Sequence, residues 1–113
     1  MKIIAVDDEY YALRGLVSAI EESLPDCYLK GFDSPVSALD YAKMNKVDYA
    51  FLDVNMPVMN GLEIAKHLKK LDPNIRTIFV IGSSQYEIER LGLKEVDCIF
   101  KPVEARKIRR HLL

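Results

Sequence analysis

The chain has 113 residues, half of them hydrophobic, and a formal net charge of −1 at pH 7. This length and composition fit one domain with a single hydrophobic core and exclude a disordered tail. The near-zero charge argues against a protein that binds nucleic acid over its whole surface. Two cysteines are too few for a disulfide framework, and no Cys/His cluster has the spacing of zinc ligands.

The first part of the chain alternates β-favouring and helical patterns. Residues 2–6 form an apolar run that stops at Asp7, too short for a signal peptide or a membrane span. A helical pattern follows, with its apolar residues on one stripe and a proline at its end. Residues 27–32 predict a second strand, with Tyr28 and Leu29 facing inward.

The middle of the chain continues this alternation. Ser34 as cap and Pro35 at the first helical position predict a helix that runs to about Met44. A third strand is expected over residues 48–52 and a third helix over 61–71. The residues expected to face inward are Val36, Leu39 and Ala42 on the second helix and Leu62, Ala65, Leu68 and Leu71 on the third.

The last part contains the most β-like run of the sequence, residues 77–81. A weaker helix over 85–91 is interrupted by Gly92, and residues 97–100 predict a fifth strand. A final helix places Ala105, Ile108 and Leu112 inward and carries basic residues at Arg106, Lys107, Arg109 and Arg110. So short a basic run is usually a solvated helix face, and we do not expect this chain itself to bind DNA.

Five predicted strands therefore alternate with five predicted helices. Such alternation specifies βαβ units and a parallel sheet covered on both faces. We predict one α/β domain over residues 1–113, a doubly wound, flavodoxin-like sheet of five strands in the order 2-1-3-4-5. In that order the first and third strands are neighbours, and sites form in the crevice at the carboxyl ends of such strands.

Charged residues follow three of the predicted strands: Asp7 and Asp8 the first, Asp53 the third and Lys101 the fifth. Taken singly, they are ordinary helix-terminal or surface residues, and only their joint occurrence indicates a site. Neighbouring carboxylates repel unless a cation neutralises them, and Mg²⁺ accepts one or two carboxylates while leaving room for phosphate. A lysine can face a phosphoryl oxygen, and a carboxylate can attack phosphorus. The pattern predicts a phosphoryl-accepting aspartate.

Three segments carry a family resemblance: residues 6–9 (Val-Asp-Asp-Glu), residues 52–61 (Leu-Asp-Val-Asn-Met-Pro-Val-Met-Asn-Gly) and the Lys101–Pro102 pair. They resemble the receiver domain of bacterial two-component response regulators, and the resemblance covers the whole chain. Residues 12–14, and residues 79–80 followed by 85–86, look closest to receivers of LytTR-type and related regulators.

The resemblance implies that Asp53 is the phosphoacceptor and that Lys101 contacts the phosphoryl group and precedes a cis peptide bond. The implied magnesium ligands are Asp7, Asp8, Asp53 and Asn55, with Asp8 bound directly, Asp7 through water and Asn55 through its backbone carbonyl. The implied phosphoryl donor is a sensor histidine kinase. Such a domain is a regulatory module and not a turnover enzyme.

The cysteine content bears on the location of the protein, and the resemblance bears on its further partners. Two lone cysteines fit a reducing, cytoplasmic setting. Receivers commonly pair through the surface around the fourth helix and fifth strand and often precede an output domain that regulates transcription. A homodimer and an output domain beyond Leu113 are therefore left open. An output domain would make this chain a fragment of a longer regulator.

Two positions depart from the receiver pattern. Ile81, followed by Gly82, stands where receivers carry a Thr or Ser whose hydroxyl binds the phosphoryl group. Ser83 or Ser84 replaces that hydroxyl only if the loop shifts register. Cys98 stands at the position of the aromatic residue that rotates inward on activation. We therefore expect a domain that accepts a phosphoryl group but responds weakly or by another route.

Other functions compete with this interpretation. A receiver-like interaction module that works without phosphorylation is favoured by Ile81 and Cys98. A small Mg²⁺-dependent phosphohydrolase of the haloacid-dehalogenase type needs Asp-x-Asp, whereas residues 53–55 read Asp-Val-Asn. A flavodoxin needs a Ser/Thr/Gly phosphate loop after the first strand, and none is present.

Overall fold

The computed structural model describes residues 1–82 and 85–112. The strands are β1 (Lys2–Val6), β2 (Tyr28–Phe32), β3 (Tyr49–Asp53), β4 (Arg76–Ile81) and β5 (Cys98–Phe100). The helices are α1 (Tyr10–Ser23), α2 (Pro35–Met44), α3 (Gly61–Leu71), α4 (Gln85–Arg90) and α5 (Ala105–Leu112), with a 3₁₀ turn, η1 (Glu95–Asp97), before β5. Within the described ranges, no helix has both the length and the apolar character needed to cross a membrane.

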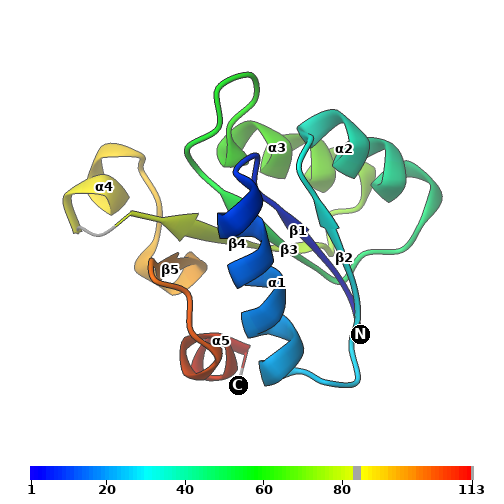
Figure 1. Cartoon of the computed structure of the whole chain (residues 1–113). Helices are drawn as coiled ribbons and strands as arrows, with labels where there is room; N and C mark the ends of the chain where they lie inside the picture. The colour runs from blue at the N-terminus through cyan, green and yellow to red at the C-terminus, as the bar shows by residue number, and fades with distance from the viewer. Residues whose placement is uncertain (83–84, 113) are drawn as a thin grey trace.

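The five strands form one parallel sheet in the order β2-β1-β3-β4-β5, as predicted. Figure 1 shows α1 and α5 on one face of this sheet and α2 and α3 on the other, with α4 beside the ends of β4 and β5. Val6 pairs with Leu52, and Asp53 pairs with Val80. This register brings the carboxyl ends of β1, β3 and β4 together at one edge of the sheet.

The core consists of two apolar layers, one on each face of the sheet. Successive strand residues point to opposite faces, so Phe51 packs with α1 and α5 residues while Leu52 packs with α2 and α3 residues. Ile20 and Ile108 are fully buried on the first side, and Ile64 is fully buried on the second. Burying one such side chain contributes about 1.5–3 kcal/mol, so both layers fix the sheet that carries the site.

Local signals in the sequence set several helix ends. The Ser34 side chain accepts a hydrogen bond from the Ser37 N–H, with Pro35 in the first turn, as predicted. Asn60 and Glu63 form a reciprocal capping box at the start of α3. That cap ends the loop after Asp53 and so fixes the path of the chain beside the site.

Three residues predicted to face inward are exposed instead: Tyr28 by 63%, Val36 by 59% and Leu71 by 44%. Tyr28 lies on edge strand β2 and cannot share a face with its neighbour Leu29, which packs against the core. In the second and third helices, the sheet is contacted by Ala38 and Ile64, both with 0% exposure. The inward side of a short helix thus depends on how it docks on the sheet.

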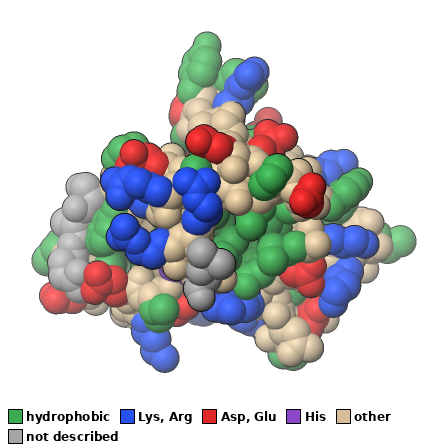
Figure 2. Space-filling view, turned by 90° about the horizontal axis from the view of Figure 1, so that it is seen from below, with side chains coloured by type: hydrophobic (Ala, Val, Ile, Leu, Met, Phe, Trp, Pro, Cys, Tyr) green, Lys and Arg blue, Asp and Glu red, His purple; other side chains and the backbone are tan. Residues whose placement is uncertain are grey.

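The exposed face of α5 is basic. Figure 2 shows the molecule from below, turned by 90° from the view of Figure 1, with Lys and Arg side chains gathered over this helix. Part of this charge is neutralised within the chain, since Glu104 lies 3.2 Å from Arg106 and 3.6 Å from Lys107. Lys107 also donates to the carbonyl oxygens of Phe100 (3.2 Å) and Pro102 (2.9 Å), which ties α5 to the end of β5.

Candidate functional site

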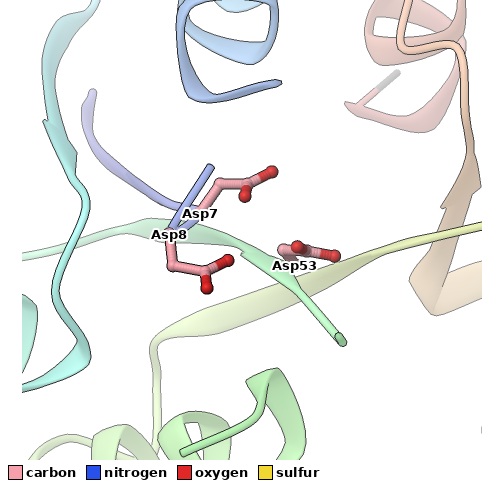
Figure 3. Close-up of side chains that lie close together, drawn as sticks. All are labelled: Asp7, Asp8 and Asp53. Carbon is pink, nitrogen blue, oxygen red and sulfur yellow. The ribbon is translucent and has the colours of Figure 1, made fainter. Parts of the chain in front are cut away.

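Three carboxylates meet at the carboxyl edge of the sheet. Asp7 and Asp8 follow β1, Asp53 ends β3, and each offers an oxygen within 4.8 Å of the others. Figure 3 shows the three side chains gathered at this edge. Asp7 and Asp53 are only 2% and 3% exposed, whereas Asp8 is exposed to solvent. The cluster predicted from the sequence therefore exists, with two buried members and one open to solvent.

Backbone groups hold the two buried carboxylates in place. Oδ1 of Asp7 accepts a hydrogen bond from the Glu9 N–H (3.0 Å), and Oδ1 of Asp53 accepts one from the Asn55 N–H (3.2 Å). Such bonds to the backbone two residues ahead are typical of Asp in turns. A Cβ at Gly61 would lie 2.6 Å from the carbonyl oxygen of Asp53, so this close approach requires glycine.

Lys101 completes the charged cluster, as predicted. Its Nζ lies 3.5 Å from Oδ1 of Asp53, and its side chain remains 40% exposed. The Lys101–Pro102 peptide bond is cis, also as predicted. The ammonium group therefore stands beside the buried carboxylate while still reaching solvent.

The electrostatics of the cluster favour a bound cation. The pKa of Asp7 is raised to about 6, chiefly by burial and to a smaller extent by the neighbouring Asp53, against the lowering effects of the Glu9 N–H and Lys101. A raised carboxylate pKa means that negative charge at this point is costly. Carboxylate oxygens are hard ligands of the kind that Mg²⁺ prefers, and the solvent-exposed Asp8 leaves an open side for water or phosphate. The residues present fit a magnesium ion.

The positions that depart from the receiver pattern lie on the β4–β5 side. Ile81 is fully buried in the apolar layer that also contains Ile88 of α4 and Cys98 of β5. Cys98 is 8% exposed, and its Sγ–H donates to the Lys94 carbonyl oxygen (3.4 Å). Burial raises the pKa of the Cys98 thiol to about 11. These residues act as hydrophobic packing groups in the structure.

Two neighbouring serines were candidates for the missing hydroxyl. Ser83 and Ser84 lie outside the described residues. Gly82, which precedes them, donates its N–H to Oε2 of Glu87 on α4 (3.2 Å). The sequence predicted no role for Glu87, because nothing in a short, weakly amphipathic helix marks one carboxylate among its charged residues.

Glu9 also has a structural role at this edge of the sheet. Its carboxylate accepts hydrogen bonds from the N–H groups of Tyr11 (3.2 Å) and Ala12 (2.7 Å) and so caps α1. An acidic residue directly before a helical pattern signals such a cap, and it satisfies N–H groups that would otherwise lack partners. Glu9 thus anchors the turn that carries Asp7 and Asp8.

Comparison with known proteins assigns the family. The family model described as "Response regulator receiver domain" matches residues 3–113 of this chain. This chain belongs to the response regulator receiver family. Domains of this family are regulatory, bind Mg²⁺ at an acidic pocket and are typically phosphorylated by sensor histidine kinases.

Individual relatives agree with this assignment. The chain is 32% identical to the cyclic di-GMP phosphodiesterase response regulator RpfG of Xanthomonas campestris pv. campestris (strain 8004), over 96% of this chain and 30% of that protein. It is 29% identical to the transcriptional regulatory protein YpdB of Escherichia coli (strain K12), over 96% of this chain and 44% of YpdB. It is 28% identical to the sensory transduction protein LytT of Bacillus subtilis (strain 168), over 99% of this chain and 46% of LytT. The chain thus spans less than half the length of these relatives.

Solved structures give the same answer. A two-component transcriptional regulator AraC from Clostridium phytofermentans ISDg superposes with a TM-score of 0.81 at 26% identity, covering 99% of this chain and 92% of that one. The response regulatory domain of protein MrkE from Klebsiella pneumoniae superposes with a TM-score of 0.78 at 29% identity, with the same coverage. The predicted flavodoxin-like receiver fold is confirmed.

Proposed function

We propose that this domain accepts a phosphoryl group on Asp53 from a sensor histidine kinase in a Mg²⁺-dependent reaction and passes the signal to an output domain or partner. The observation that carries the proposal is the position of Asp53. The Asp53 side chain is 5% exposed, its carboxylate lies within 4.8 Å of the Asp7 and Asp8 oxygens, and the Lys101 ammonium is 3.5 Å away. A buried nucleophile flanked by metal ligands and a cation is what phosphoryl transfer requires, because the protein mainly positions groups and offsets charge.

The chemistry is a displacement at phosphorus. A carboxylate oxygen of Asp53 bonds to phosphorus while the P–N bond of a phosphohistidine breaks, and the electron pair returns to the imidazole of the kinase. The Asn55 N–H, bonded to Oδ1, holds the carboxylate in one orientation. Lys101 neutralises charge that gathers on the phosphoryl oxygens. When bound by Asp7, Asp8, Asp53 and the Asn55 carbonyl, Mg²⁺ supplies further positive charge to the same oxygens.

A second function is favoured by the β4–β5 side. Ile81 offers no hydroxyl to a phosphoryl group and is fully buried, and Cys98 offers no aromatic ring to rotate. A receiver-like module that docks or dimerises without phosphorylation needs neither group. Pairing through the surface of α4 and β5, a C-terminal output domain and a cytoplasmic location with two free thiols all remain parts of the proposal.

Intact-mass measurement after incubation with acetyl phosphate separates the two functions. In this reaction a P–O bond of acetyl phosphate breaks and acetate leaves as the Asp53 oxygen bonds to phosphorus. We expect a gain of one phosphoryl group that requires Mg²⁺ and is absent in Asp53→Ala. A folded protein that binds Mg²⁺ yet gains no mass would favour the phosphorylation-independent module.

A further inference from the structure

The backbone N–H of Gly82 leaves the sheet toward the phosphoacceptor strand. The Val80 carbonyl accepts the Val54 N–H from the β3 side, and the Ile81 carbonyl accepts the Lys101 N–H from the β5 side. Backbone groups alternate sides along a strand, so the N–H of Gly82, the next residue, points back to the β3 side. Because Asp53 ends β3 and pairs with Val80, this donor faces the edge at which a phosphoryl group on Asp53 would stand.

That donor is held by a carboxylate. Oε2 of Glu87 accepts the Gly82 N–H at 3.2 Å, and a Cβ built on Gly82 would lie 3.3 Å from the same oxygen. Glu87 therefore covers the backbone of Gly82 closely, and a side chain at this position would force the carboxylate to shift. The contact joins the end of β4 to α4, which is also attached to the core through the buried Ile88.

The Gly82 N–H would have two candidate acceptors once Asp53 carried a phosphoryl group. The single Gly82 N–H faces the Glu87 carboxylate, and a phosphoryl group on Asp53 would bring a second set of negatively charged acceptor oxygens to the same edge. Like charges that share a donor repel, and the more highly charged phosphate makes the stronger charge-assisted hydrogen bond.

We infer that Glu87 gates the phosphoacceptor site. Its carboxylate holds the Gly82 N–H in the unmodified protein, and it gives that donor up when Asp53 is phosphorylated, which removes one contact between the end of β4 and α4. The gate rests on the proposed function, and it supplies a route from Asp53 to α4 that does not need a hydroxyl at Ile81. In this route the group that moves is the Glu87 carboxylate, which the phosphate repels. A Thr or Ser hydroxyl at position 81 would instead be attracted to the phosphate.

The rate of phosphorylation by acetyl phosphate and Mg²⁺, followed by intact mass, tests the gate. Glu87→Gln keeps an oxygen that accepts the Gly82 N–H but loses the charge, and Glu87→Ala loses both. We expect each variant to react roughly two- to fivefold faster than the wild type, the range of a partly exposed charge interaction. Glu89→Gln is the matched control, because it makes the same charge change on the exposed side of α4 and should react at the wild-type rate.

The amide signal of Gly82 gives an independent readout, since the chain has only five glycines and their NMR signals are readily followed. Phosphorylation should shift this signal in the wild type, and Glu87→Ala should shift it before phosphorylation. Equal rates for the Glu87 and Glu89 variants, or an unmoved Gly82 signal in a wild type that has gained mass, overturn the gate alone. A gain of one phosphoryl group by the Glu87→Gln variant but not by the wild type supports a closed gate. No uptake by either overturns the proposed function and the gate together.

Discussion

The two halves of the carboxyl edge differ in chemistry. On the β1–β3 side, Asp7, Asp8 and Asp53 gather within 4.8 Å and two of them are buried. On the β4–β5 side, Ile81 and Cys98 are apolar packing groups in the core. In the proposed function, the acyl phosphate forms on the first half with help from Lys101, which reaches over from the end of β5, whereas the signal leaves through the second half. The proposal therefore treats acceptor chemistry and signal output as separable.

Removing the exposed carboxylate of the proposed magnesium site should produce the largest effect. Asp8→Asn keeps the shape of an exposed side chain but removes a charged oxygen from the cluster. Since even indirect partners of a metal contribute 10- to 100-fold, we expect the Mg²⁺-dependent rate of phosphorylation to fall by more than about 100-fold. Initial rates measured over a Mg²⁺ titration check this. An unchanged rate would show that Asp8 is not a ligand of the proposed magnesium ion.

The charge of Asp7 should lower stability when no metal is bound. Its pKa is about 6 in the folded protein against an ordinary value of 3.8, so the folded state binds a proton more tightly than the unfolded chain does. The free energy of unfolding therefore falls as pH rises from about 4 to about 6 and stays low above that range. Asp7→Asn abolishes this loss and should stabilise the protein at pH 7 by up to about 3 kcal/mol, at 1.4 kcal/mol per pKa unit.

Thermal unfolding in chelator-treated buffer at several pH values measures this effect. The amide side chain of the Asp7→Asn variant keeps an oxygen for the Glu9 N–H, so the comparison isolates the charge. Asp33→Asn, at an exposed aspartate, is the control and should leave the pH dependence unchanged. A destabilised Asp7→Asn protein would show that the charge is compensated within the fold. Added Mg²⁺ should narrow the gap between wild type and variant, because a cation neutralises the same charge.

Gly61 lies directly against the backbone of Asp53, the proposed phosphoacceptor. A Cβ there would lie 2.6 Å from the Asp53 carbonyl oxygen, so Gly61→Ala forces the backbone of β3 or α3 to shift. Overpacking of this kind costs about 1–3 kcal/mol in the free energy of unfolding. Gly15→Ala is the matched control, since a Cβ on that α1 residue meets nothing within 4 Å and should stabilise the helix by about 0.5–1 kcal/mol. Urea denaturation of both variants gives the sign of each change.

The acidic half was predictable from the sequence, and most of the other half was not. Asp7, Asp8, Asp53 and Lys101 each follow an apolar run, and strand alternation alone brings such residues to one edge. The hydrogen bond between Gly82 and Glu87 depends on how a short helix docks at the end of β4, which no periodicity encodes.

The wrong predictions of which side chains are buried also arise from tertiary packing that the sequence pattern does not encode. Tyr28 and Val36 are apolar residues in patterns that predict burial, yet they are 63% and 59% exposed. Edge strand β2 has a neighbouring strand on one side only. Val36 is two positions before the buried Ala38, which places it on nearly the opposite side of α2. Propensity and spacing identify the element, whereas tertiary packing decides which side of a marginal element is covered.

Restoring a hydroxyl at Ile81 should have the smallest effect on stability and the most informative effect on output. Ile81→Thr loses a buried methylene and places a hydroxyl in an apolar layer, so we expect a loss of about 1–2 kcal/mol in the unmodified protein. Ile81→Val, the control, loses a methylene without adding a hydroxyl. If phosphate recruits the hydroxyl, phosphorylation should shift α4 amide signals further in the Thr variant than in the Val variant. If Glu87 alone transmits the signal, the two variants should respond equally, and adding Glu87→Gln should abolish the response in both.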